Sequence, residues 1–217
     1  MIQTIMVKVI SYSLWGTNDT YCLGAIENAM MSKHIYPDWQ CWFYCHTTVQ
    51  PDIIEQLIAF DHVRIIRQTD NLGYFWRFYP NDEPDVDYFI SRDTDSRLSL
   101  KEKAAVDEWL ASGKSAHTMR DHPNHRRAFM GGMSGFRTKV FNIKPLILKW
   151  LETHNPGFNS DQQFLADVIS KLVQNDIIVH SSQKFYRTDF KFPLVGSVDG
   201  GFVGARIILS NKGRTTL

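Results

Sequence analysis

The sequence predicts one α/β domain in which helices flank a mixed, mostly parallel β-sheet. Apolar runs alternate with helical patterns along the N-terminal part of the chain, as in proteins with parallel sheets. The 217 residues suffice for one substantial core and not for two. Two acids, Asp93 and Asp95, directly follow an apolar run, and open α/β sheets bind ligands beyond the carboxyl ends of their strands. We therefore expect the functional site at that edge of the sheet.

Apolar runs bounded by turn residues predict the strands of this sheet. They lie at 5–13, 40–46, 62–67, 87–91, 115–120 and 176–180. The run at 87–91 is the one that carries the two acids at its carboxyl end. The basic, glycine-punctuated segment 121–137 reads as a loop, and the chain after 180 as a glycine-rich stretch with a polar tail.

Capping residues and apolar periodicity predict the helices between these strands. The helices lie at 19–33, 53–60, 99–110, 141–153 and from 160 onward, with one or two helical turns at 70–80. Asn18 or Asp19 can cap the first helix. The inner face of this helix is expected to carry Leu23, Ile26, Ala29 and Met30. Two capping boxes, S-L-K-E from Ser99 and S-D-Q-Q from Ser160, open two of the later helices.

Composition narrows the classes of partner. A formal net charge of +1 gives no electrostatic reason to expect nucleic acid or an anionic membrane. Aromatic residues make up 13% of the chain, which suits a site that stacks on a nucleobase or a sugar, although aromatics mostly fill cores. We expect no nucleic-acid partner, and we favour a monomer.

The three cysteines are read as reduced, buried thiols, because their number is odd and no secretory leader precedes them. Cys41, Cys45 and His46 could be imagined as zinc ligands. However, their segment, WQCWFYCH, is apolar, and no second ligand pair follows at useful spacing. Neither a signal peptide nor an apolar run long enough to span a bilayer is recognisable, so we expect a soluble, cytoplasmic protein.

The D-x-D pair in YFISRDTDSR (88–97) carries the chemistry. Mg²⁺ and Mn²⁺ prefer oxygen ligands, and Mg²⁺ in phosphate sites takes one or two carboxylates together with phosphate oxygens and water. Asp93 and Asp95 therefore predict a metal and a phosphorylated substrate. The alternative is a surface turn whose acids cap a helix or pair with Arg92 and Arg97.

These motifs, taken in order, resemble the small GT-A glycosyltransferases, which have a Rossmann-like sheet. The pattern SRDTDSR…EWL.SGK…MRDHP…GGM.G is most similar to that of the capsid-glycosylating enzymes of large algal viruses and related bacterial proteins. The resemblance runs over about 5–205. It implies a single domain over 1–217, with a nucleotide-binding half at about 1–97, an acceptor-side half at about 98–205 and a polar tail at 206–217. For a viral protein the compartment would be the host cytosol.

The resemblance also implies a metal site and a catalytic residue. In this family the D-x-D acids, here Asp93 and Asp95, hold Mn²⁺ or Mg²⁺ against the diphosphate of a nucleotide sugar. His180 resembles a late histidine that completes the metal coordination in some members, although a histidine at a strand end is more often structural. Asp161 matches the general base of inverting members. Its alternative is a favourable acid in the first turn of a helix.

The remaining site residues are expected to bind the two substrates. For the nucleotide and diphosphate they are Ser11, Tyr12, Ser13, Trp15, Arg77, Arg92, Asp93 and Thr94. For the sugar and acceptor they are Arg120, His122, Gly131, Gly132 and Met133. The alternatives are an ordinary tight turn at the two glycines and a solvated loop around Arg120 and His122. Tyr12 or Trp15 would stack on the base, unless they are plain core aromatics. Arg77 matches phosphate oxygens with its guanidinium fork, unless it faces solvent.

The function implied is a metal-dependent, inverting transfer of a sugar from a nucleotide-sugar donor, with UDP-sugars favoured, to a glycan or glycoprotein hydroxyl. Two alternatives remain. One is a non-catalytic nucleotide-sugar or glycan-binding module on the same fold. The other is a phosphatase of the haloacid-dehalogenase kind, in which Asp93 would be the nucleophile. Arg97 argues against the phosphatase, because that motif continues with Thr or Val at this position.

Overall fold

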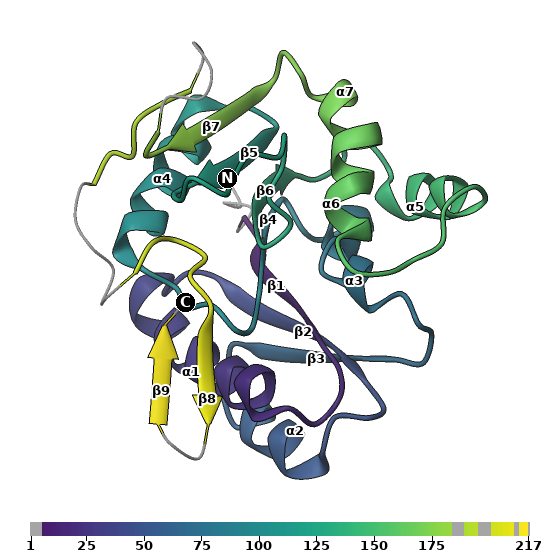
Figure 1. Ribbon diagram of the computed structural model, residues 1–217, viewed down its shortest axis with the longest axis vertical. Coiled ribbons are helices and arrows are strands. Elements are labelled where there is room, and N and C mark those ends of the chain that lie inside the picture. The colour runs from purple at the N-terminus through teal and green to yellow at the C-terminus, as the bar shows by residue number, and fades with distance from the viewer. Residues whose placement is uncertain (1–5, 184–188, 195–200, 211–212, 217) are drawn as a thin grey trace, which may run out of the picture.

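A seven-stranded sheet in the order β3-β2-β1-β4-β6-β5-β7 runs through the protein (Figure 1). The structure is a computed structural model that describes residues 6–183, 189–194, 201–210 and 213–216. The strands are β1 (Lys8–Leu14), β2 (Gln40–His46), β3 (Val63–Gln68), β4 (Tyr88–Arg92), β5 (Ala116–Arg120), β6 (Met133–Arg137) and β7 (Ile177–Ser181). Neighbours pair in parallel, except that β6 is antiparallel to β4 and β5. The mixed, mostly parallel sheet expected from the sequence is confirmed.

Helices cover both faces of this sheet (Figure 1). They are α1 (Asp19–Ile35), α2 (Pro51–Ile58), α3 (Gly73–Trp76), α4 (Leu100–Ser112), α5 (Ile143–Leu151), α6 (Ser160–Phe164) and α7 (Ser170–Leu172). A 3₁₀ turn, η1 (Tyr79–Asp82), follows α3, and a π-helical segment, η2 (Leu165–Ile169), joins α6 to α7. The predicted helices are present, with ends that differ by a few residues.

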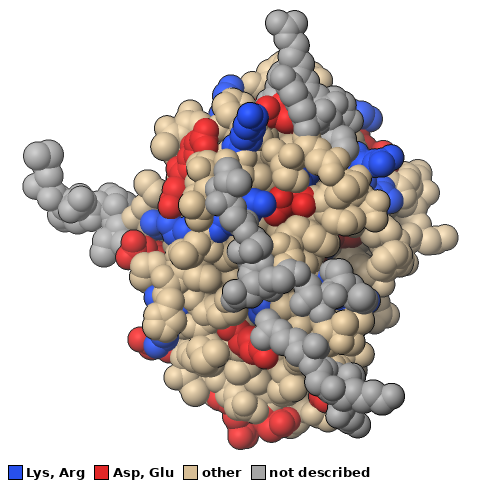
Figure 2. Space-filling model, turned by 60° about the vertical axis from the view of Figure 1, so that its left-hand side comes forward, with Lys and Arg blue, Asp and Glu red and all other residues tan. Residues whose placement is uncertain are grey.

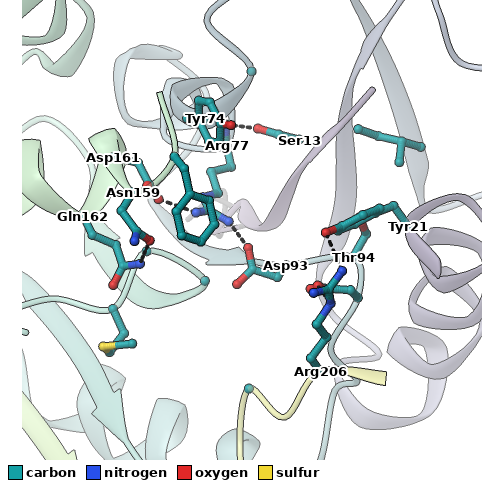
Figure 3. Close-up of a pocket in the computed structure, with 18 of the residues that line it drawn as sticks. Ser13, Tyr21, Tyr74, Arg77, Asp93, Thr94, Asn159, Asp161, Gln162 and Arg206 are labelled. Atoms are coloured by element: carbon teal, nitrogen blue, oxygen red, sulfur yellow. Dashed lines mark hydrogen bonds and ion pairs between the residues drawn. The ribbon is translucent and has the colours of Figure 1, made fainter. Parts of the chain in front are cut away.

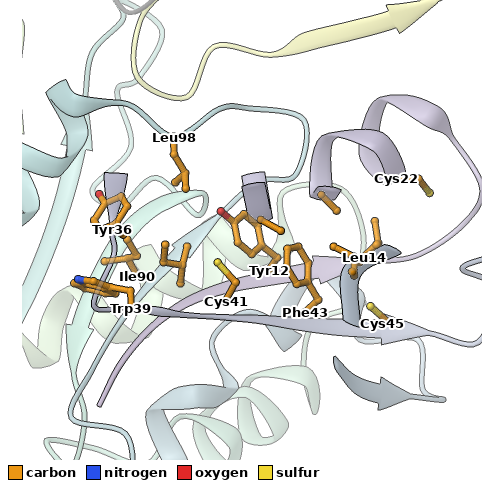
Figure 4. Close-up of a cluster of buried hydrophobic side chains, with 14 of the residues drawn as sticks. Tyr12, Leu14, Cys22, Tyr36, Trp39, Cys41, Phe43, Cys45, Ile90 and Leu98 are labelled. Carbon is orange, nitrogen blue, oxygen red and sulfur yellow. The ribbon is translucent and has the colours of Figure 1, made fainter. Parts of the chain in front are cut away.

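Two apolar cores, one on each face of the sheet, fix which way each strand residue points. Helices α1, α2 and α4 pack on one face, where Tyr12 of β1 stacks on Phe43 of β2 with ring centroids 4.7 Å apart (Figure 4). Helices α3, α5 and α6 pack on the other face, with Val9 of β1 and Phe89 of β4. Successive strand residues alternate between these faces.

The cysteines lie in the first of these cores. Cys22, Cys41 and Cys45 are buried free thiols, as expected (Figure 4). Burial raises the pKa of Cys41 and of Cys45 to about 12, so both are uncharged at neutral pH. Among the residues that the structure describes, no group of three or more His, Cys, Asp or Glu side chains could hold a metal ion.

Helix α1 buries only part of the expected face, since Ala29 is fully buried and Ile26 packs against the core. Asn18 caps it by accepting a hydrogen bond from the N–H of Thr20 (2.9 Å), but Leu23 and Met30 are 39% and 54% exposed. The residues that it buries are mostly small, namely Thr20, Cys22, Gly24, Ala25, Asn28, Ala29 and Ser32. The reason is close packing, because a Cβ on Gly24 would collide with the carbonyl oxygen of Thr94. Large apolar side chains on that face would hold α1 away from the D-x-D segment.

Contacts with α1 hold the segment that follows β4. The Asn28 amide donates to the carbonyl of Ser96 (2.8 Å) and accepts from the N–H of Leu98 (3.2 Å). Arg97 donates to the carbonyl of Thr94 (3.0 Å) and pairs with Glu27 (2.5 Å). The backbone that carries both motif acids is therefore anchored to α1, which favours a defined geometry for their carboxylates.

Strand β6 corrects the prediction for 121–137, where the sequence indicated a loop. Gly135, which looked like a turn residue, lies within β6, and a Cβ there would be 2.8 Å from the Trp109 ring. The glycine thus lets α4 pack closely on the sheet. Because β6 pairs with β4, it brings Gly131 and Gly132 next to the end of β4.

The C-terminal segment is also more ordered than a polar tail. Strands β8 (Ile207–Ser210) and β9 (Gly213–Thr216) form a two-stranded antiparallel sheet. The N–H of Leu209 donates to Thr20 of α1 (3.1 Å), and the N–H of Ile207 donates to the carbonyl of Asp95 (2.7 Å). The end of the chain therefore lies against the D-x-D segment.

The surface carries charges of both signs. Figure 2 shows acidic and basic side chains interspersed among uncharged residues on one face. Within the described ranges, no helix has both the length and the apolar character needed to cross a bilayer.

Candidate active site

A pocket of about 630 Å³ opens beyond the carboxyl ends of β1 and β4 (Figure 3). Its volume is in the range of small-molecule sites. The walls come from the segment after β1, the start of α3, the D-x-D segment, the glycines before β6, the start of α6 and residues 204–206. The site therefore lies at the edge of the sheet where the sequence predicted it.

Arg77 joins two carboxylates at the floor of the pocket. One terminal nitrogen donates to Asp93 Oδ1 and the other to Asp161 Oδ2 (Figure 3). The Arg77 side chain is 12% exposed and that of Asp161 only 4%. The backbone N–H of Arg77 donates to Ser13 Oγ at the end of β1 (3.0 Å), which ties α3 to the sheet. The guanidinium bridges the two carboxylates with one terminal nitrogen on each and so fixes the positions of Asp93 and Asp161, which lie 68 residues apart in the sequence.

Two glycines form the wall beside these carboxylates. A Cβ on Gly132 would collide with the Asp93 carboxylate, and a Cβ on Gly131 would collide with that of Asp161. Gly131 and Gly132 lie in a turn closed by the hydrogen bond from the N–H of Met133 to the carbonyl of Met130 (2.9 Å), and neither glycine is in the left-handed region. The requirement is for space that the two carboxylates occupy, and the approach of a sugar to this backbone stays a prediction.

Asp95 lies on the opposite side of the pocket in a different electrostatic setting. Its carboxylate pairs with Arg206 (Nε to Oδ2, 3.1 Å), and Arg206 donates to the Tyr21 hydroxyl (3.0 Å; Figure 3). Burial, followed by the charge of Asp93, raises the pKa of Asp95 to about 6. The pair Asp93 and Asp95 thus concentrates negative charge that the protein offsets with an arginine on each side.

Trp15 supplies an aromatic surface at the edge of the pocket. Its side chain is 43% exposed and packs edge-on against Tyr74 (5.4 Å between centroids) and Trp76 (6.2 Å). A Cβ on Gly73 would be 2.9 Å from the Trp15 ring, so the ring lies directly on the start of α3. In the described part of the chain, Trp15 is thus one of four aromatic residues of the pocket, with Tyr21, Tyr74 and Phe158, and its stacking on a base stays a prediction.

Three of the expected nucleotide contacts do not line the pocket. Tyr12 is fully buried against Phe43, and Arg92 pairs with Glu102 (2.9 Å) beneath α4. Ser11 is buried in the sheet and does not line the pocket. Strand alternation explains the first two, because Tyr12 and Arg92 face the α1–α4 side of the sheet, opposite to Ser13 and Asp93.

His180 does not meet the D-x-D acids. It is fully buried on β7, with 2.8 Å between its Nδ1 and His117 Nε2 and 3.3 Å between its Nε2 and Glu108 Oε2. It does not line the pocket, so the structure offers no support for His180 as a metal ligand. Burial lowers the pKa of His180 and, more strongly, that of His117, which keeps this pair neutral inside the protein.

The expected acceptor residues divide into two groups. Gly131, Gly132 and Met133 line the pocket, as does Thr94 of the nucleotide set. Arg120 and His122 do not. Arg120 is 4% exposed and donates to the carbonyls of Arg127 (3.1 Å) and Ala128 (3.2 Å), and His122 stacks on Phe202 with 4.4 Å between centroids. Arg120 thus holds the segment 127–128, and His122 packs between Phe202 and His125, which itself lines the pocket.

Several pocket residues had no part in the prediction. They are Tyr21, Tyr74, Phe158, Asn159, Gln162 and Arg206. Tyr74 lies in the aromatic run that suggested Arg77, and Phe158 and Asn159 directly precede the helix that carries Asp161. Ser160 was expected to cap that helix, but it is the first helical residue. The capping position belongs to Asn159, whose φ of 65° is in the left-handed region.

The donor set suits a hard divalent cation. Asp93 and Asp95 present carboxylate oxygens to one pocket, and two protein carboxylates with substrate phosphate oxygens are a usual environment for Mg²⁺. Asp93 is 46% exposed and Asp95 16%, so both can be reached from the pocket. The residues therefore fit a metal–diphosphate site without a third protein ligand.

Comparison with known proteins identifies the fold. No protein-family model matches the sequence, and no curated protein proves similar to it. A glycosyltransferase involved in the glycosylation of the major capsid of PBCV-1 is 15% identical, with a TM-score of 0.53 and coverage of 81% of each chain. Mannosyltransferase PcManGT from Pyrobaculum calidifontis, in complex with GDP-Man and Mn²⁺, is 10% identical, with a TM-score of 0.52 and coverage of 82% of this chain and 57% of that one.

A third structure with this fold belongs to a different class of enzyme. The 4-diphosphocytidyl-2C-methyl-D-erythritol synthase from Anaerococcus prevotii is 11% identical, with a TM-score of 0.55 and coverage of 89% of this chain and 92% of that one. At such identities a likeness establishes the fold alone. The chain has the GT-A fold, so the fold expected from its motifs is confirmed.

Proposed function

We propose that the protein is a glycosyltransferase that moves a sugar from a nucleotide diphosphate sugar, with UDP-sugars favoured, to a hydroxyl of a glycan or glycoprotein. One observation carries the proposal. Asp93 and Asp161 bind the two ends of the Arg77 guanidinium, and their carboxylates pack directly on the backbone of Gly132 and Gly131. These charged groups, which suit a diphosphate with its cation, line a pocket of about 630 Å³, which has the volume for a sugar ring as well.

The walls of the pocket suit the two ends of the donor. The exposed face of Trp15, supported by Tyr74, can stack on the base, because every nucleobase has a flat π-face. At the other end of the donor, Arg206 would offer positive charge to the diphosphate, and the D-x-D acids would hold a cation against it. The transferred sugar would then lie over Gly131 and Gly132, next to Asp161.

Asp93 and Asp95 would hold Mn²⁺ or Mg²⁺ together with the diphosphate oxygens of the donor. When bound, the cation neutralises the negative charge that develops on the leaving diphosphate. Arg77 keeps Asp93 and Asp161 apart at a set distance, so that the first faces the diphosphate and the second faces the sugar. Because Gly131 and Gly132 have no side chains, nothing displaces these two carboxylates from their positions.

The inverting outcome depends on Asp161. An inverting transfer needs a base that takes the proton of the acceptor hydroxyl as the new bond forms. Because Arg77 donates to Oδ2 of Asp161, the other carboxylate oxygen is the one available for that proton. The anomeric configuration of the product, measured by NMR, tests this role. Retention of configuration would leave Asp161 only the task of positioning Arg77.

Calorimetric titration with nucleoside diphosphates tests whether the pocket binds the nucleotide part of the donor. We expect UDP to bind in the presence of Mn²⁺, and Asp93→Asn and Asp95→Asn to lose that binding. Asp107→Asn is the matched control, because Asp107 is an exposed acid paired with Lys103 on α4. Binding that does not depend on the metal, or the failure of every nucleoside diphosphate to bind, would contradict the proposal.

Activity assays separate the proposal from its alternatives. Asp161→Asn should abolish transfer and preserve UDP binding, whereas a binding module would show no turnover in either form. Release of pyrophosphate from a nucleoside triphosphate would instead indicate nucleotidyl transfer. A trapped aspartyl-phosphate on Asp93 would favour a phosphatase.

A further inference from the structure

We infer that the start of α6 and the residue pair before it form an acceptor subsite, in which Phe158 stacks against the C–H face of a pyranose ring and Gln162 accepts a hydrogen bond from one of its hydroxyls. The inference rests on the proposed sugar transfer and names the chemical class of its acceptor, a pyranoside. Three features of Phe158, Asn159 and Gln162 support it.

The first feature is the exposure of Phe158. Its side chain is 86% exposed, the highest value among the exposed large apolar residues of the described chain, yet it lines the pocket. An aromatic ring at the mouth of a polar pocket leaves a large apolar surface in water. A pyranose ring has one face made mainly of C–H groups, and covering the phenyl ring with that face would bury both apolar surfaces.

The second feature is an unsatisfied amide oxygen. The Nε2 group of Gln162 donates to Oδ1 of Asn159 (2.8 Å), which fixes the orientation of the Gln162 amide. Its Oε1 atom is then buried without a hydrogen-bond partner among the residues that the structure describes. Buried polar atoms nearly always have a partner, so an unpaired acceptor that lines a pocket indicates a missing donor. A sugar hydroxyl is such a donor.

The third feature is the backbone that presents these side chains. Asn159 has a φ of 65°, in the left-handed region that non-glycine residues seldom adopt. Ser160 holds the turn by accepting a hydrogen bond from the N–H of Gly157 (2.5 Å). Asparagine adopts this region more readily than other non-glycine residues, so its presence at position 159 suits this turn. The turn directs Phe158 outward while Asp161 points into the pocket.

The position of the subsite agrees with the geometry of transfer. In Figure 3, Asn159, Asp161 and Gln162 lie on one side of the pocket and Tyr21 and Arg206 on the other, with Arg77 and Asp93 between them. A donor diphosphate at the D-x-D side and an acceptor ring at the α6 side would meet beside Asp161. The acceptor contact thus moves from Arg120 and His122, which are engaged elsewhere, to Phe158 and Gln162.

Saturation-transfer NMR with methyl glycopyranosides tests the inference directly. The probes are the methyl glucosides, galactosides and mannosides of both anomeric configurations, with UDP and Mn²⁺ present. We expect saturation to reach the ring protons on one face of at least one pyranoside. Phe158→Ala should weaken that binding by about 3- to 10-fold, Phe158→Tyr should preserve it, and Gln162→Ala should weaken it independently.

Leu148→Ala is the matched control, because Leu148 is 60% exposed on α5 and does not line the pocket. The thermal shift given by UDP should be the same in all variants, which separates the subsite from donor binding. Equal pyranoside binding by the wild type and Phe158→Ala, or no saturation of any pyranoside while UDP still binds, would overturn the subsite alone. Failure of UDP to bind would count against the proposed donor instead. A change of oligomeric state in Phe158→Ala would assign the ring to a protein contact and would likewise overturn the subsite.

Discussion

The two acids of the D-x-D motif lie one residue apart but belong to differently built walls of the pocket. The wall around Asp93 consists of Arg77, Asp161 and Gly132, which lie at the end of α3, at the start of α6 and directly before β6. The wall around Asp95 is completed by Arg206, whose side chain is 48% exposed and which comes from the C-terminal segment. Core packing therefore supports the first wall, and a peripheral segment closes the second.

A few specific hydrogen bonds attach that peripheral segment. The N–H of Val203 donates to Asp121 (2.8 Å), that of Ile207 to the carbonyl of Asp95 (2.7 Å) and that of Leu209 to Thr20 (3.1 Å). The segment also buries Val203 and Ile207, but it lies outside the seven-stranded sheet and its two main cores. Segments at the periphery of a fold open more easily than those within its core. We therefore expect the wall around Asp93, here called the rigid wall, to move less when a ligand binds than the wall around Asp95, here called the peripheral wall.

The largest effect is expected where the rigid wall is most crowded. In Gly132→Ala, the new methyl group would collide with the Asp93 carboxylate and move it out of place. We expect kcat/KM for sugar transfer to fall by about 100-fold, since a displacement of about 1 Å at a reacting centre has that effect. Gly157→Ala is the control, because a Cβ there would meet nothing closer than Ser160 Oγ at 4.0 Å. Equal activity of the two variants would contradict the crowding argument.

The next effect concerns the stability of the same wall. Arg77→Ala leaves the Asp161 carboxylate buried without its cation, and breaking such a pair costs about 3 kcal/mol in the free energy of unfolding. The double variant Arg77→Ala, Asp161→Asn should lose less than the sum of the two single variants, because a neutral amide needs no counter-charge. Urea unfolding measures all three. Strict additivity would mean that the two residues are not coupled.

On the other wall, Asp95→Asn should stabilise the protein while it removes metal-dependent UDP binding. The folded-state pKa of Asp95, about 6, lies above the usual unfolded value of about 3.9, so ionising Asp95 costs stability in the folded state. The gain from Asn should be about 1 to 2 kcal/mol above pH 6, shrink between about pH 6 and 4, and vanish at lower pH. Thermal unfolding across this pH range measures it. A gain that grows as the pH falls would contradict the argument.

The sequence predicted the rigid wall better than the peripheral one, for a physical reason. Asp93, Gly132 and Asp161 follow or precede regular elements whose signals are local, and Arg77 lies in a short helical run. Tyr12 and Arg92 were assigned to the wrong face although strand alternation, applied to Val9 and Phe89, would have corrected them.

Other parts of the site lacked a usable local signal. Arg206 pairs with Asp95, which lies 111 residues earlier in the sequence, and no local sequence pattern predicts that contact. The acidic residue of the predicted S-L-K-E box, Glu102, shows a further limit. Ser99 does accept the hydrogen bond from the N–H of Glu102 (3.2 Å), but the Glu102 side chain accepts from Arg92 (2.9 Å) and Tyr36 (3.1 Å). Tertiary contacts gave this residue a second role.

The smallest expected effect tests whether the peripheral wall competes with the cation. Arg206 and a divalent cation would both use the Asp95 carboxylate, so removing the guanidinium should leave that acid freer to bind metal. We expect Arg206→Ala to raise the affinity for Mn²⁺ alone by about two- to fivefold, because half-exposed ion pairs contribute up to about 1 kcal/mol. Electron paramagnetic resonance of free Mn²⁺ measures this without any turnover. Lys33→Ala, which removes an exposed cation paired with Asp61, is the control for net charge. If Arg206→Ala bound Mn²⁺ no better than this control, Arg206 would position the Asp95 carboxylate rather than compete with the cation for it. The two walls would then differ in construction but not in their response to the metal.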